Sequence, residues 1–263
     1  MKTLARVAYL AATLSVALVT SACGSSASDF DGPSAEAEDD EAWGEPPLGN
    51  VGKADGTWEA TLAARKEFAA KFQLPTLTDA EQQEVLARYS NIDVDREAPR
   101  DLLEDALLYY DFNWELLENP DYLTLIDFSQ HSSKRRLYVV DMQTGELARS
   151  VVAHGSGSDP DNDGVPTQFS NVNNSHKSSL GFYVAAETYH GKWGLSLRLD
   201  GLSETNSDAR PRAIVMHGAS YVVDGKAKQG RSWGCPAIPM SSKDALIAKL
   251  KAGSLMYAER SAE

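Results

Sequence analysis

Residues Gly230–Pro239 read GRSWGCPAIP and place one cysteine, Cys235, between a glycine and a proline. The sequence holds only one other cysteine, Cys23, close to its beginning. A lone cysteine can be a small, buried apolar side chain. In an exported protein, however, cysteines normally pair as disulfides, so an unpaired one indicates a free, reactive thiol. The cysteine count alone leaves both interpretations of Cys235 open.

A histidine precedes Cys235 by eighteen residues, at the end of a strand-like apolar run, RAIVMHG, over residues 212–218. Attack of a cysteine on a carbonyl needs a base to form the thiolate and N–H donors to hold the oxyanion. His217 suits the base, since the ordinary pKa of histidine is about 6.5. Gly234 and Cys235 offer backbone N–H donors, and Gly218 leaves room beside the base. A hydrogen-bonded structural histidine is the alternative.

The hydrophobic period changes near Pro120. Before it, three segments have helical spacing, and Thr78 with Glu81 makes a capping-box pattern at the start of the second. After it, short β-favouring runs alternate with turn residues, and residues 241–253 predict one short helix. The sequence therefore predicts an α+β protein, with a helical N-terminal subdomain over residues 58–120 and a mainly β domain over residues 121–263.

Residues 1–22 are typical of an export signal, because Lys2 and Arg6 precede an apolar run that is too short to span a bilayer. Small residues then lead directly to Cys23, which resembles the lipobox of bacterial lipoproteins. That resemblance implies a lipid anchor on Cys23 and a place at the periplasmic face of the cell envelope. Gly24 favours the outer membrane if the host is Gram-negative. Cleavage nearby as an ordinary signal peptide is the alternative.

The formal net charge is −13, and residues 29–59 carry ten acidic side chains against one lysine. Residues 23–57 are also poor in apolar side chains, so they cannot bury enough surface to offset the entropy of ordering. We expect this segment to be a flexible acidic tether, with an interaction tail as the alternative. No basic cluster indicates a nucleic-acid partner.

The pair His217-Gly218, followed after a loop by Ser-x-Gly-Cys, resembles the catalytic signature of the bacterial L,D-transpeptidases. The similar text runs from about Asp121 to Ala258 and resembles the YkuD-like branch with a GRSWGCPA-type sequence. This resemblance implies a β-sandwich or barrel with a short C-terminal helix. It also implies roles for five residues: Cys235 as nucleophile, His217 as base, Ser232 as part of the catalytic loop, and Gly234 and Gly218 at the oxyanion site and strand-end pocket.

The same resemblance implies peptidoglycan chemistry. A Cys235 thioester would carry a stem peptide to an acceptor amine and give a 3→3 cross-link, or exchange a terminal D-amino acid, without a cofactor. Carbapenem-type inhibitors are expected. The commonest signature has an arginine where this chain has Ala237. Arg231 is a candidate to bind a substrate carboxylate or to order the site, and Trp233 and His154 are candidate substrate contacts.

Three other function classes remain open from the sequence. An L,D-carboxypeptidase or endopeptidase would use the same thioester and pass it to water. A papain-like enzyme would have its cysteine before its histidine, whereas here His217 comes first. A wall-binding lipoprotein without catalysis would not need the combination of His217, Ser232, Gly234 and Cys235.

One acidic loop resembles the first half of a calcium loop. Asp159, Asp161 and Asp163 alternate and are followed by Gly164, but the twelfth position is Ser170 instead of glutamate. We favour an ordinary polar turn, with a structural Ca²⁺ as the alternative. The histidines of this region lack the close spacing of a metal site.

Overall fold

The structure is a computed structural model that describes residues 57–262. Cys23, the predicted export signal and almost all of the predicted tether lie outside these residues. No helix within them is long and apolar enough to cross a membrane. The helices are α1 (Thr57–Ala69), α2 (Asp79–Arg88), α3 (Arg100–Asn113) and α4 (Lys243–Leu250), with short 3-10 turns η1 (Trp114–Leu116), η2 (Ser156–Ser158) and η3 (Glu204–Asn206).

Eight strands form one sheet in the order β3-β2-β1-β8-β4-β5-β6-β7. The β1–β8 and β6–β7 pairs are parallel, and the other pairs are antiparallel. The strands are β1 (Tyr122–Asp127), β2 (Leu137–Asp141), β3 (Leu147–Ser150), β4 (Gly181–Gly191), β5 (Gly194–Gly201), β6 (Val215–Ala219), β7 (Ala237–Pro239) and β8 (Leu255–Glu259).

The sheet curves toward a barrel. After β3, the chain returns to the far edge of the sheet, where Ala153 bridges Ala237 of β7 and Gly155 bridges Ser232. These two bridges connect the β3 side of the sheet with its last strand. The predicted mainly β, barrel-like architecture is therefore confirmed.

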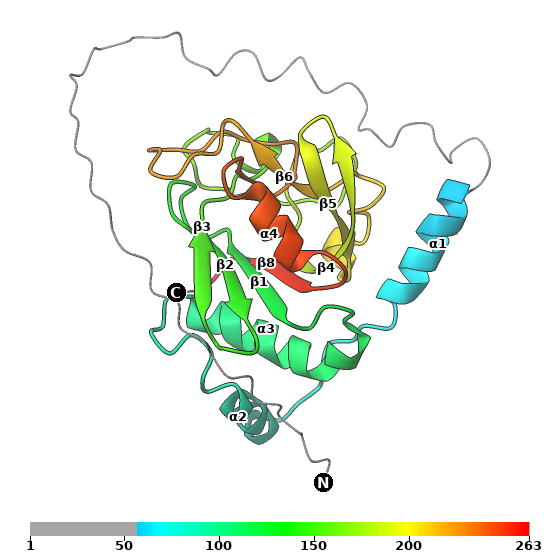
Figure 1. Ribbon diagram of the computed structural model, residues 1–263, viewed down its shortest axis with the longest axis vertical. Helices are drawn as coiled ribbons and strands as arrows, with labels where there is room; N and C mark the ends of the chain where they lie inside the picture. The colour runs from blue at the N-terminus through cyan, green and yellow to red at the C-terminus, as the bar shows by residue number, and fades with distance from the viewer. Residues whose placement is uncertain (1–56, 263) are drawn as a thin grey trace, which may run out of the picture. The chain divides into compact units, whose positions relative to one another are not determined.

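Alternating side chains of the strands supply two cores on opposite faces of the sheet, as the two-residue period of a strand requires. In β8, Leu255 and Tyr257 join one core, and Met256 and Ala258 join the other. Residues of α3 cover the first core, and Ile247 of α4 enters the second. Figure 1 shows α3 beside β1 and β8, and α4 beside β5 and β6.

The helical segment before Pro120 packs directly on the sheet. Tyr109 of α3 stacks on Phe182 of β4 with ring centroids 3.7 Å apart, and Phe182 stacks on Tyr257 at 4.1 Å. The predicted capping box is confirmed, because Thr78 and Glu81 exchange hydrogen bonds at the start of α2. The helical segment and the strands therefore share the first of these two cores.

Candidate active site

Two neighbouring strands bring the candidate nucleophile and base together. β6 and β7 are parallel, and their register places His217 opposite Ala237. Cys235 lies two residues before Ala237, in the segment that enters β7. The parallel β6–β7 pair thus places the segment that carries Cys235 next to the strand that carries His217.

His217 is 1% exposed, and its ring stacks on Trp193 with centroids 5.6 Å apart. Its Nδ1 lies 3.0 Å from the carbonyl oxygen of Gly218. A carbonyl oxygen only accepts, so Nδ1 carries the ring proton and Nε2 carries the lone pair. Burial lowers the pKa of His217 to about 4, although the bond to Gly218 acts in the opposite direction. The ring is therefore neutral at pH 7, with Nε2 as its basic atom.

The Cys235 thiol is buried, and its Sγ lies 3.7 Å from the carbonyl oxygen of Ala213. Burial raises the pKa of Cys235 to about 11, against smaller lowering effects of the Val215 backbone and the Arg212 guanidinium. The resting thiol is therefore protonated. Since both partners are neutral, His217 would have to take the thiol proton during attack rather than before it.

Ser232 and Gly234 shape the loop that carries Cys235. The Ser232 hydroxyl donates to the Cys235 carbonyl at 2.6 Å and accepts from the Gly234 N–H at 3.1 Å. Gly234 has φ +118°, and a Cβ there would lie 2.7 Å from the backbone oxygen of Lys177. Only glycine meets both requirements. The Gly234 N–H, a predicted oxyanion donor, is thus engaged inside the loop.

The predicted pocket at Gly218 is filled by neighbouring side chains. A Cβ on Gly218 would lie 2.7 Å from both Met240 Sδ and Lys243 Cδ. The Gly218 carbonyl accepts the His217 bond described above. Gly218 therefore contributes a backbone carbonyl that orients the His217 ring.

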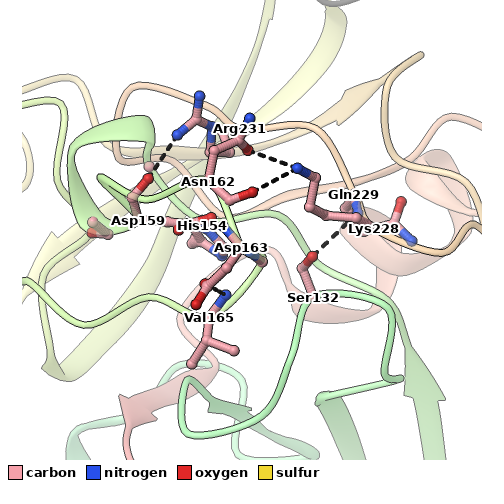
Figure 2. Close-up of polar contacts among 12 residues, drawn as sticks. Ser132, His154, Asp159, Asn162, Asp163, Val165, Lys228, Gln229 and Arg231 are labelled. Atoms are coloured by element: carbon pink, nitrogen blue, oxygen red, sulfur yellow. Dashed lines mark hydrogen bonds and ion pairs between the residues drawn. The ribbon is translucent and has the colours of Figure 1, made fainter.

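Arg231 and Trp233 point to other segments of the chain. Arg231 donates from Nη1 to the Asp159 backbone oxygen at 2.7 Å, which Figure 2 shows. Trp233 stacks on His176 with centroids 4.2 Å apart and an interplanar angle of 9°. Of the two roles predicted for Arg231, this geometry matches ordering of the site.

His154 is buried rather than exposed in a cleft, at 1% exposure. Its backbone oxygen accepts from the Ser232 N–H at 2.8 Å. Its ring lies between Arg136, with Nη2 2.6 Å from Nδ1, and Asp159, with Oδ2 3.3 Å from Nε2. His154 therefore contacts the loop that carries Cys235 through its backbone, at Ser232.

The acidic loop does not gather its carboxylates around a common point. Asp159 accepts from the backbone N–H groups of Asp163 and Gly164, and Asp163 accepts from the Val165 N–H. Within residues 57–262, no group of three or more His, Cys, Asp or Glu side chains could hold a metal. The loop is a turn organised by its own backbone, and the calcium prediction gains no support from it.

Sequence reasoning missed two arginines near the site. Arg136 contacts the His154 ring, and Arg212 lies near Cys235, fixed by the backbone oxygens of Ser170 and Lys177 at 2.7 and 2.5 Å. The signal for Arg136 is weak, since it is one of three consecutive basic residues before β2. Arg212 opens the apolar run that ends in His217, and that position could have flagged it.

Comparisons with known proteins identify the family of this chain. A family model described as the L,D-transpeptidase catalytic domain matches residues 95–258. A search of curated proteins finds no match.

Among solved structures, an L,D-transpeptidase from Mycobacterium smegmatis is 11% identical, with a TM-score of 0.34, covering 53% of this chain and 58% of that chain. L,D-transpeptidase 3 from Mycobacterium tuberculosis is 10% identical, with a TM-score of 0.36, covering 53% and 61%. An L,D-transpeptidase in complex with imipenem is 11% identical, with a TM-score of 0.33, covering 53% and 59%. The chain thus spans less than two thirds of the length of these proteins.

The family assignment rests on the family model, which matches more than half of the chain and includes both strands of the candidate site. The chain belongs to the L,D-transpeptidase catalytic domain family.

Proposed function

We propose that this protein is a peptidoglycan L,D-transpeptidase that works through a thioester on Cys235. The observation that carries the proposal is the parallel β6–β7 pair, which places the segment with the buried Cys235 thiol next to the strand with His217, whose Nε2 carries a lone pair. Membership of the family supports the class of substrate. The arrangement supplies a nucleophile and a base from this chain alone.

In the first half-reaction, Cys235 Sγ attacks the carbonyl carbon that joins the third stem residue to D-alanine. His217 Nε2 takes the thiol proton as the C–S bond forms, and then passes it to the departing amine of D-alanine. The stem remains bound as a thioester. The oxyanion needs a donor at the loop, and the Cys235 N–H is our candidate because Ser232 already engages the Gly234 N–H.

In the second half-reaction, an amine of a neighbouring stem attacks the thioester carbonyl. His217 accepts the proton of that amine and returns it to sulfur, so the thiol is restored and a 3→3 amide is formed. A free D-amino acid as acceptor would give exchange of the terminal residue. Water as acceptor would give an L,D-carboxypeptidase instead.

We further propose that the protein is an exported lipoprotein anchored through Cys23 at the periplasmic face of the envelope. The acidic tether would give the catalytic part reach toward the wall. We also propose carbapenems as acylating inhibitors of Cys235. One structural neighbour is a complex with imipenem, and this chain has a cysteine at the matching signature.

Incubation of the protein with disaccharide-tetrapeptide, followed by mass spectrometry of the products, tests the proposal. We expect loss of D-alanine and new 3→3 dimers, which disappear in Cys235→Ala and in His217→Gln. His190→Gln, at an exposed histidine of β4, is the matched control and keeps the activity. Shortened monomers alone would indicate a hydrolase, and unchanged tetrapeptide would favour a wall-binding role.

A further inference from the structure

A fully buried arginine contacts His154, the residue whose backbone oxygen binds Ser232. Arg136 is 0% exposed and donates to the backbone oxygens of Gln130 and Val152 at 2.6 and 3.1 Å. Its Nη2 also lies 2.6 Å from His154 Nδ1. Burial lowers the pKa of Arg136 to about 9, so the guanidinium stays charged at neutral pH.

This arginine determines where the proton of the His154 ring lies. A guanidinium only donates, so Nδ1 accepts and the ring proton is on Nε2. Nε2 then donates to Asp159 Oδ2 at 3.3 Å. Burial and the nearby Arg136 lower the pKa of His154 to about 2. The result is a charged arginine and an aspartate side chain joined by a neutral imidazole of fixed orientation.

The backbone of His154 and its neighbours holds the catalytic loop. The His154 oxygen accepts from Ser232 N–H at 2.8 Å, and the Ser156 N–H donates to the Ser232 oxygen at 2.7 Å. The Ser232 hydroxyl donates in turn to the carbonyl of Cys235. Three hydrogen bonds therefore connect the ring-bearing segment with the residue that attacks.

Two cationic side chains that precede Ser232 in sequence bind the acidic loop of Asp159–Gly164, as Figure 2 shows. Arg231 donates to the Asp159 backbone oxygen at 2.7 Å, and Lys228 Nζ donates to the backbone and side-chain oxygens of Asn162 at 2.7 and 3.0 Å. These oxygens belong to the loop that the sequence suggested for calcium. Side chains of the segment that leads to Cys235 thus bind oxygens of this loop directly.

We propose that Arg136, His154 and Asp159 are positioning residues that fix the Cys235 loop for attack, acting through Ser232. This inference rests on the proposed function, in which Cys235 is the nucleophile. A buried charge is expensive to keep where an apolar side chain would pack more cheaply, so a role in holding one conformation accounts for it better than stability does.

Four full-length variants test the proposal. Arg136→Met removes the donor to His154, and Arg136→Lys keeps the charge on a single donor nitrogen. Asp159→Asn replaces one acceptor oxygen with a donor, so either the Asp163 N–H loses its acceptor, or the Gly164 N–H and His154 Nε2–H lose theirs together. Val140→Ala is the control. Val140 is a buried residue of β2, and shortening it leaves a cavity in the first core without changing a contact of Arg136, His154 or Asp159. For each variant we would measure the melting temperature, kcat and KM for disaccharide-tetrapeptide, and the single-turnover rate of acylation.

We expect Arg136→Met and Asp159→Asn to lower kcat and the acylation rate by about 10²-fold with little change in KM, since a misplacement of about 1 Å can have that effect. Arg136→Lys should recover part of the rate. Val140→Ala should melt earlier and keep its rate per folded molecule. Rates in the Arg136 and Asp159 variants that follow only the folded fraction would overturn the proposal, whereas a wild-type protein that makes no product would overturn the proposed function instead.

NMR of the histidine ring nitrogens tests the same network in the unaltered protein. His154 should carry its proton on Nε2 and stay neutral between pH 5 and 8, while His217 should carry its proton on Nδ1. A His154 ring that titrates in this range, or that is protonated on Nδ1, would contradict the network.

Discussion

At the scale of single residues, the chemistry depends on a neutral thiol and a neutral imidazole. Burial moves the two pKa values apart, to about 11 for Cys235 and to about 4 for His217. An ion pair, in which the thiolate exists before substrate binds, would require the reverse order of pKa values. The account therefore requires His217 to act as a general base in the attacking step.

The first prediction concerns the acid limb of kcat/KM. His217 can accept a proton only when its Nε2 is unprotonated, so activity falls as the pH drops through the pKa of that ring. Because burial lowers this pKa, we expect the limb below the ordinary value of about 6.5 and toward 4. A pH profile of wild-type kcat/KM measures it. An acid limb at or above 6.5 would contradict a buried His217 ring with a lowered pKa as the base.

The second prediction compares two glycines with positive φ. Gly234 has φ +118° and no room for a Cβ, whereas Gly225 has φ +83° and nothing within 4 Å of that position. Gly234→Ala should displace the loop and lower kcat by about 10²-fold or more. Gly225→Ala carries similar backbone strain without a clash and should keep near wild-type kcat. Equal losses in the two variants would show that backbone strain, not the close approach to Lys177, explains the effect.

The residues themselves were partly predictable. The sequence predicts a histidine on a strand and a cysteine in a glycine-rich loop, and the structure has His217 on β6 and Cys235 in the segment that enters the adjacent β7. Arg231 and His154, which remain predicted substrate contacts, have partners in distant parts of the chain: the Asp159 backbone oxygen and the buried Arg136. Contacts of this kind join segments that are far apart along the chain, and residue type and spacing do not encode them.

At the scale of elements, the parallel β6–β7 pair and the helix α3 matter most. β7 is only three residues long, and its pairing with β6 and its bridge to Ala153 hold the Cys235 segment in place. Strands and the capping box were predictable because they depend on local patterns. The sheet order and the two parallel pairs were not, since they depend on crossings between distant segments.

The third prediction tests whether α3 belongs to the same cooperative unit as the sheet. Tyr109 is 2% exposed and stacks on Phe182. Tyr109→Ala should lower the free energy of unfolding by about 3 to 5 kcal/mol, as expected for a buried aromatic side chain. Phe112→Ala changes a side chain of the same helix that is 54% exposed, and should change it by less than about 0.5 kcal/mol. Urea unfolding followed by near-UV circular dichroism measures both.

If Tyr109→Ala melted α3 in a separate, earlier transition and left the sheet transition unchanged, the helical segment would be an independent unit. A single shifted transition would support one core that both parts share.

At the scale of the whole molecule, two buried histidines link stability to pH. In the folded state burial lowers the pKa of His217 to about 4 and of His154 to about 2. Above about pH 6.5 the rings are neutral in both states. Below it the unfolded chain takes up protons that the folded chain does not, so stability falls as the pH falls through this window.

The fourth prediction concerns the size of this loss in the free energy of unfolding. Between pH 6.5 and pH 5, each of the two rings should reduce the free energy of unfolding by about 2 kcal/mol. His217→Gln should lose its share of the pH dependence, whereas His190→Gln, at an exposed site, should not. Urea unfolding at pH 7 and pH 5 provides the comparison. A pH dependence in His217→Gln equal to that of the wild type would contradict the burial of a neutral ring.

The most direct test of the central claim is the mass of the enzyme during turnover. Rapid acid quenching after mixing with disaccharide-tetrapeptide should trap a protein heavier by the stem that has lost D-alanine. Trypsin should place the added mass on the peptide from Ser232 to Lys243, since cleavage sites at Arg231 and Lys243 bound it. The adduct should be absent in Cys235→Ala. An active enzyme without an adduct on this peptide, or with one elsewhere, would contradict the account.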